Sequence, residues 1–164
     1  MGHMEESSAD GHEFMEQEDW ESWAALLMLH RAVLQDLDTE LRQQHKLAVS
    51  EFDVLITLFN APDHRLGMSA LAHEAMLSPA GITHLVTRLE RDGLVKREVD
   101  PADRRKWFTV LTEEGDRALR AARHTHNTVL RRTFLAATSA ADREVLTQLW
   151  QRLASAETGA DAAP

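Results

Sequence analysis

The run from Ser78 to Gly93 constrains this chain most, because it carries the start and stop signals of one short amphipathic helix. Ser78 is a good N-cap, Pro79 suits the first helical position, and Gly93 suits a left-handed stop. Apolar residues recur between these signals at helical spacing: Ile82, Leu85, Val86 and Leu89. The opposite face carries hydrogen-bond donors and positive charge: Thr83, His84, Thr87, Arg88 and Arg91. We therefore expect a helix over 78–92 with one buried face and one polar, cationic face.

A short hairpin is expected directly after this helix. Residues 94–99 and 107–111 have the composition of two strands, and the loop 100–106 between them ends in Arg104, Arg105 and Lys106. Before the helix, residues 68–76 predict a shorter helix that would brace it, with a tight connection at 77–78. A bracing helix, a capped second helix and a hairpin with a basic tip are the outline of a winged helix-turn-helix.

Longer helices are expected on both sides of this central part. A stripe at steps of three and four runs through residues 18–46: Trp20, Trp23, Leu27, His30, Leu34, Leu37 and Leu41. It is longer than one small domain can bury, which favours a partner subunit over a long core helix. A second helix should begin at Ser50, with Asp53 as a capping-box residue, and stop before Pro62.

The remaining segments complete a chain that is mainly α with a small β-hairpin. Residues 62–67 predict a turn-rich connection, Thr112 caps a helix that reaches about Ala136, and Ser139 with Asp142 begins a last helix. We expect one domain over 18–157, with a lobe at about 50–112 between the helices at about 18–46 and 113–157. Residues 1–17, which are acidic, and 158–164 are expected to be mobile tails, and 1–3 suit a cloning remnant.

The charge is placed unevenly along the chain. The formal net charge is -9, yet eight of the acidic residues lie in the first thirty positions, where there is no Lys or Arg. Between Arg88 and Lys106, seven cations outnumber five acids. A local basic patch of this kind can bind phosphate, while the acidic remainder limits non-specific binding.

Five residues of the hairpin region carry a more specific pattern. Asp103, Arg105, Leu111, Thr112 and Gly115 reproduce the spacing D-x-R-x5-L-T-x-x-G, which resembles the wing of the MarR (multiple antibiotic resistance regulator) family of transcription factors. The segments 77–79, 88–90 and 93–95 are similar to its recognition helix, and the resemblance extends over roughly residues 20–156. It implies a winged helix-turn-helix with N- and C-terminal dimerisation helices, and a homodimeric DNA-binding regulator.

The resemblance also implies how DNA would be read. The 78–92 helix would enter the major groove of an inverted-repeat operator, and the 100–106 wing would enter the minor groove. Arg105 would enter the minor groove and Asp103 would orient it, whereas the alternative is that this pair only locks the wing turn. The predicted DNA-binding residues are Ser78, Pro79, Ala80, Gly81, Thr83, His84, Thr87, Arg88, Asp103, Arg104, Arg105 and Lys106.

Family members often act as repressors, and a small aromatic or phenolic acid often relieves the repression. Such ligands bind between the DNA-binding lobe and the dimerisation helices. In this chain Trp20, Trp23, His30 and Asp53 would line that pocket, although each also suits a place in the core or a helix cap. The sequence therefore permits an effector without identifying it.

Two other binding functions compete with this interpretation, and we expect neither an enzyme nor a cofactor. A zinc-responsive regulator of the same fold would need metal ligands on one helix face, but His73 and Glu74 are adjacent and His124 and His126 diverge. A protein-interaction wing would not need the cationic tip. No nucleophile with a base, no catalytic carboxylate pair and no glycine-rich phosphate loop is recognisable.

The compartment follows from what the sequence lacks. There is no cysteine, so disulfides and thiol-based sensing are excluded. No apolar run is long enough to span a bilayer, and the acidic N-terminus does not resemble a signal peptide. We expect a cytoplasmic protein without a membrane partner.

Overall fold

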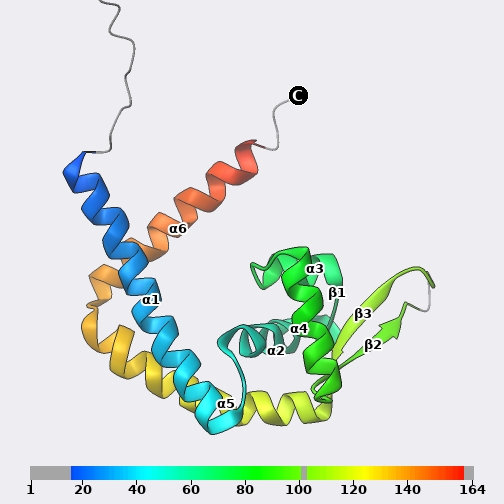
Figure 1. Cartoon of the computed structure of the whole chain (residues 1–164). Coiled ribbons are helices and arrows are strands. Elements are labelled where there is room, and N and C mark those ends of the chain that lie inside the picture. Colours follow the sequence, from blue (N-terminus) through cyan, green and yellow to red (C-terminus); the bar gives the residue numbers. More distant parts are fainter. Residues whose placement is uncertain (1–15, 101–102, 161–164) are drawn as a thin grey trace, which may run out of the picture. The chain divides into compact units, whose positions relative to one another are not determined.

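The computed structural model describes residues 16–100 and 103–160, so most of both predicted tails lies outside the described residues. The chain divides into two compact units, one up to Ala32 and one from Val33 onward, and α1 crosses the boundary (Figure 1). The helices are α1 (Gln17–His45), α2 (Val49–Asn60), α3 (Met68–Glu74), α4 (Pro79–Arg91), α5 (Glu113–Leu130) and α6 (Ala140–Ala160). The strands are β1 (Arg65–Gly67), β2 (Val95–Val99) and β3 (Trp107–Leu111). No described helix has the length and apolar character needed to cross a membrane.

The strands form one small antiparallel sheet in the order β1-β3-β2. The predicted hairpin is confirmed, with Val95 opposite Leu111 and Val99 opposite Trp107. The third strand was not predicted, because residues 65–67 were assigned to a turn-rich connection. This strand pairs Arg65 with Val110 on the other edge of β3, so the prediction for this segment was wrong in part.

The core of the second unit lies among α2, α3, α4, β2 and α5. Its fully buried side chains include Phe52, Leu55, Leu71, Ile82, Val86, Leu89 and Leu119. α4 contacts α3, β2 and α2, so the apolar face predicted for it is covered from three directions. Burial of these side chains fixes the orientation of the helix, since each contributes roughly 1.5–3 kcal/mol when it leaves water.

The long stripe of α1 is buried only in part. Leu37 and Leu41, in the second unit, are 3% and 0% exposed. In the first unit Trp20 and Trp23 remain 56% and 46% exposed, and Leu27 is also exposed. In the second unit α6 has a similar exposed set: Val145, Leu149, Trp150 and Leu153. Single chains rarely leave so many large apolar side chains in water.

The start of α2 differs from the prediction. The N-cap is Ala48, not Ser50, and the third helical residue is Glu51, not Asp53. The Glu51 carboxylate accepts a hydrogen bond from the Ala48 backbone nitrogen at 2.7 Å, which fulfils the capping role. Asp53 therefore does not cap this helix. The cap predicted for the last helix is confirmed. The Asp142 carboxylate accepts a hydrogen bond from the Ser139 backbone nitrogen, and the Ser139 hydroxyl accepts one from the Asp142 backbone nitrogen.

Candidate nucleic-acid interface

The helix α4, whose exposed face is the candidate reading surface, begins and ends at the capping residues that the sequence predicted. The Ser78 hydroxyl accepts from the Gly81 backbone nitrogen at 3.1 Å, and Gly93 ends the helix at a φ of 75°. Thr83, His84 and Thr87 are exposed on the side away from the core. Around them lies a shallow hollow of about 460 Å³, lined by His84, Leu85, Thr87, Arg88 and Arg91.

The hydroxyls on this face have different hydrogen-bonding capacities. Thr83 and Thr87 donate to the backbone oxygens of Pro79 and Thr83, each at 2.8 Å. Their hydroxyl protons are thus engaged. The Thr83 oxygen is left suited to accept from an amino group on a base edge, whereas the Thr87 oxygen already accepts from Arg97 at 3.0 Å. Ser78 accepts its internal bond and keeps its own proton, so it is suited to donate to a phosphate.

Arg88 is held differently from its neighbours on the same face. Its Nε lies 2.5 Å from Oε1 of Glu51, and Glu51 is 5% exposed. A buried carboxylate needs such a partner. Arg88, predicted as a DNA contact, therefore also ties α4 to the first turn of α2. Sequence reasoning missed Glu51, although its spacing to Leu55 and Leu58 places a charge among core positions.

The wing, which is the hairpin of β2 and β3, presents its cations through a compact turn. The Asp100 backbone nitrogen donates to the Lys106 carbonyl at 2.9 Å. The Lys106 backbone nitrogen donates to the Asp103 carbonyl at 2.8 Å. Asp103 Oδ1 accepts from both the backbone nitrogen and Nε of Arg105, at 3.1 Å and 3.2 Å. Asp103 therefore both closes the turn and orients the guanidinium. The Arg105 side chain is 92% exposed, and Arg104 and Lys106 are exposed beside it.

The base of the wing explains the second half of the five-residue pattern. The Thr112 hydroxyl donates to the Gly93 carbonyl at 2.7 Å and accepts from the Gly115 nitrogen at 3.0 Å. A Cβ on Gly115 would lie 2.0 Å from the Leu94 carbonyl oxygen. Glycine is thus required where α5 passes the end of α4, and this contact fixes the wing beside the reading helix.

The four predicted effector residues are divided between the two units. Trp20, Trp23 and His30 lie on α1 in the first unit, whereas Asp53 lies on α2 in the second. Neither unit by itself contains all four. Asp53 is an exposed residue, although partial desolvation of its carboxyl raises the pKa of that group, an effect that the nearby His126 opposes. His126 itself stacks on Phe52, with ring centroids 4.6 Å apart.

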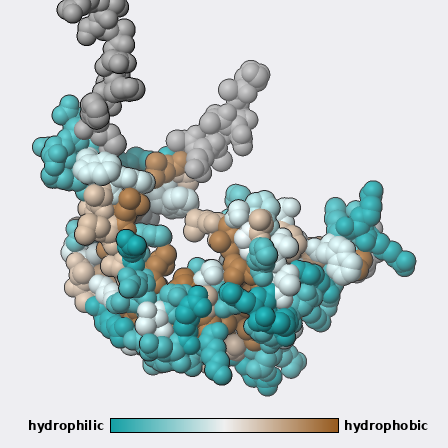
Figure 2. All heavy atoms as spheres, in the orientation of Figure 1, coloured by the Kyte–Doolittle hydropathy of each residue, from teal (hydrophilic) through white to brown (hydrophobic). Residues whose placement is uncertain are grey.

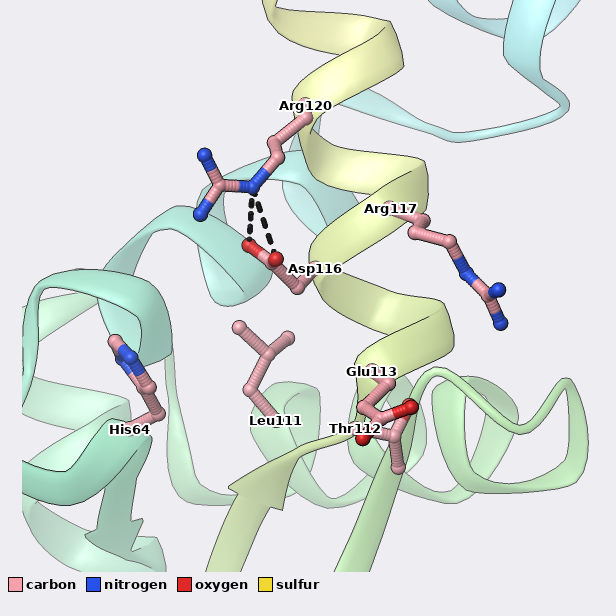
Figure 3. A pocket seen from close by; sticks show the side chains of 7 residues that line it. All are labelled: His64, Leu111, Thr112, Glu113, Asp116, Arg117 and Arg120. Atoms are coloured by element: carbon pink, nitrogen blue, oxygen red, sulfur yellow. Dashed lines mark hydrogen bonds and ion pairs between the residues drawn. The ribbon is translucent and has the colours of Figure 1, made fainter.

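A second hollow, of about 340 Å³, lies where β3 meets α5 (Figure 3). Its lining residues are His64, Leu111, Thr112, Glu113, Asp116, Arg117 and Arg120. The Arg120 Nε donates to both oxygens of Asp116, at 2.9 Å and 2.8 Å, and its guanidinium also lies over the Phe59 ring. Charges that satisfy one another in this way indicate a structural cluster. Among the described residues, no group of three or more metal-ligating side chains converges.

A braced, exposed helix beside a cationic wing defines a winged helix-turn-helix protein of the DNA-binding class. Residues 47–107 match the MarR family. The chain is also 32% identical over 118 residues to the transcriptional regulator HosA of Escherichia coli O111:H-, covering 70% of this chain and 85% of HosA. The chain belongs to the MarR family of transcriptional regulators.

Two further similarities support this assignment. The transcriptional repressor YetL of Bacillus subtilis is 42% identical over 69 residues, which cover 42% of this chain and 41% of YetL. The chain thus spans less than half of YetL's length. Sco3205, a MarR family regulator from Streptomyces coelicolor solved in complex with DNA, superposes with a TM-score of 0.83 at 26% identity, over 90% of this chain and 92% of Sco3205. The protein is therefore a DNA-binding transcriptional regulator.

Proposed function

We propose that this regulator is a homodimeric repressor that binds an inverted-repeat operator and is released by a small-molecule effector. The observation that carries the DNA-binding part is the pairing of the exposed polar face of α4 with the exposed Arg105 beside it. One element suits a major groove and the other suits a narrow, electronegative minor groove. YetL is a repressor, which supports the same direction of control here.

The individual DNA contacts follow from the hydrogen-bonding state of each side chain. Thr83, Thr87 and His84 face the base edges, and Ser78 donates to a phosphate near the start of the helix. Pro79, Ala80 and Gly81 add little bulk there, so the backbone can approach the duplex closely. Arg104 and Lys106 neutralise phosphates, while Asp103 holds Arg105 in the orientation for the minor groove.

The dimer would bury the apolar side chains that one chain leaves in water. On α1 these include Trp20, Trp23 and Leu27, and on α6 they include Leu149, Trp150 and Leu153. A second copy supplies a matching apolar surface by symmetry. Two copies of α4 would then address half-sites about 34 Å apart, one helical turn of DNA.

The effector would be a small aromatic acid. Trp20, Trp23 and His30 of α1 are one candidate set of contacts for it, and Asp53 of α2 is another. The family resemblance supports this choice, as do the exposed indoles of α1 and the carboxyl of Asp53. Binding there would alter the separation of the two reading helices.

A binding assay on the intergenic DNA beside the protein's own gene tests the proposal. We expect a shift of this duplex at low salt, a steep loss of affinity with added salt, and a footprint with two symmetric halves. Sedimentation should give a dimer at the concentrations used. A monomer, or a footprint over a single asymmetric half-site, would refute the proposed mode of binding.

A further inference from the structure

The wing carries an exposed apolar pair that none of the functions above uses. Trp107 is 51% exposed and Val99 is 39% exposed, and the two residues lie opposite each other on β3 and β2. In Figure 2, pale and brown atoms lie on the wing just inside its teal tip. An indole exposed in this way on a small hairpin suggests that something covers it.

The face of the hairpin on which this pair lies can be read from the strand register. Side chains alternate along a strand, so Arg97 shares a face with Val99, and Thr109 shares it with Trp107. Arg97 donates to the Thr87 hydroxyl at 3.0 Å and pairs with Glu90 at 3.2 Å, and both partners are on α4. Trp107 and Val99 therefore lie on the face turned toward the reading helix. Arg97 on this face is in contact with α4, whereas Trp107 and Val99 are exposed.

Positive charge lies on the outer side of this pair. Arg104, Arg105 and Lys106 immediately precede Trp107 in the chain, and Arg105 is 92% exposed. Trp107 and Val99 are thus bounded by the reading helix on one side and by the cationic tip on the other. A duplex strand that separates a major groove from the neighbouring minor groove would have to cross this position.

We propose that Trp107, supported by Val99, packs against a deoxyribose of the DNA strand that separates the two grooves. This inference rests on the proposed function, because it takes α4 in the major groove and the wing tip in the minor groove. The sugar offers the apolar surface that a duplex backbone presents between its phosphates, and an indole covers such a surface with few rotatable bonds. A second copy of the chain is a poorer occupant, since its own wing would bring three like charges to the same place.

A sugar contact leaves a distinctive signature in binding data. It adds apolar burial but neutralises no phosphate, so it changes affinity without changing the number of released counterions. Removing Trp107 should therefore lower affinity at every salt concentration by the same factor. Removing Arg104 or Lys106 should instead reduce the salt slope.

The experiment measures anisotropy with a fluorescein-labelled duplex of the intergenic DNA beside the protein's own gene, at several salt concentrations. We expect Trp107→Ala to weaken binding about five- to twentyfold with an unchanged salt slope, and Trp107→Phe to retain most of the affinity. Glu98→Gln, on β2 and on the opposite face of the hairpin from Trp107, should not show this loss of affinity. Wild-type tryptophan emission should change when DNA is added, and this change should be largely lost in Trp107→Phe.

Three results would overturn the inference. One is wild-type affinity in a Trp107→Ala variant that is folded by circular dichroism. Another is a change of salt slope, and the third is an altered oligomeric state, which would assign the surface to a contact between chains. If wild type itself fails to bind at low salt, the proposed function fails and the inference falls with it, so the two failures are distinguishable.

Discussion

The Nε of Arg88, on the reading helix α4, lies 2.5 Å from Oε1 of Glu51 in the first turn of α2. Glu51 is 5% exposed, and its other oxygen accepts from the backbone nitrogen of Ala48, which is 2% exposed. One buried carboxylate thus serves the start of α2 and the face of α4 together. The orientation of the reading helix depends on this shared acceptor as well as on apolar packing.

Arg88→Ala should lower the stability of the fold as well as its affinity for DNA. The substitution leaves Glu51 with one donor in place of two, and a buried carboxylate that loses its charged partner is costly. Because the Arg88 side chain is 43% exposed, we expect a loss of about 1–2 kcal/mol, below the usual cost of breaking a fully buried pair. Urea denaturation of both proteins measures the difference.

Arg91→Ala is the matched control for this prediction. Arg91 is on the same helix, but its pair with Asp92 is exposed, so Arg91→Ala should unfold at nearly the wild-type urea concentration. If Arg88→Ala unfolds at the wild-type urea concentration and loses only DNA affinity, the link to Glu51 has no role in positioning the helix.

The sequence predicted α4 and the wing closely because their signals are local. Ser78, Pro79 and Gly93 mark the helix within its own residues, and strand composition marks the hairpin. The start of α2 was predicted two residues late, since Ser50 is the better isolated cap. Glu51 prevails because it reaches back to Ala48 and is paired by Arg88, a residue distant in the chain.

β1 and the role of Gly115 were also beyond local reasoning. Residues 65–67 form a strand only because β3 offers a free edge, and Leu66 and its neighbours carry no alternating pattern of their own. The glycine belongs to the family pattern, but its physical reason lies in the Leu94 carbonyl, twenty-one positions earlier. Contacts of this kind become visible only when the segments are placed together.

Gly115→Ala should destabilise the protein strongly, although alanine is normally the better residue in a helix. The added Cβ would lie 2.0 Å from the Leu94 carbonyl oxygen and 2.8 Å from a methyl of Leu111, so backbone must move. We expect a loss of about 3 kcal/mol. Thermal unfolding followed by circular dichroism measures this loss.

Gly67→Ala provides the comparison for that substitution. Its added Cβ would meet nothing nearer than the Trp107 carbonyl oxygen at 3.9 Å, and the residue has an ordinary φ of -66°. This variant should remain within about 0.5 kcal/mol of wild type or become slightly more stable. Equal effects at the two glycines would show that the approach to Leu94 does not limit the substitution.

Asp53→Asn should stabilise the protein at neutral pH and have little effect in acid. Burial raises the pKa of the Asp53 carboxyl in the folded state, although His126 partly offsets the rise. A raised pKa means that folding favours the protonated acid, so this contribution to stability is complete below about pH 4 and is lost as the pH rises through the folded pKa. Melting temperatures of wild type and variant at pH 4 and pH 7.5 should therefore converge in acid and separate at neutral pH. Asp53 is itself exposed, so the difference between the proteins should be small. Asp36→Asn on α1 is the control, and an Asp53→Asn variant less stable than wild type at pH 7.5 would contradict the sign.

Arg105→Ala should weaken operator binding by about 1–3 kcal/mol and leave the free energy of unfolding unchanged. The guanidinium is 92% exposed and its pair with Asp103 lies in solvent, so the fold gains little from it. Asp103 would still close the turn through the Arg105 backbone nitrogen, because that bond needs no side chain at position 105. Fluorescence anisotropy over a range of salt concentrations, together with urea denaturation, separates the two effects.

Arg105→Lys is the informative second variant: a lysine keeps the charge but loses the planar donor fork, so it should recover the salt slope and only part of the affinity. Full recovery by lysine would reduce the role of this residue to a point charge, and unchanged binding by a folded alanine variant would remove it from the interface.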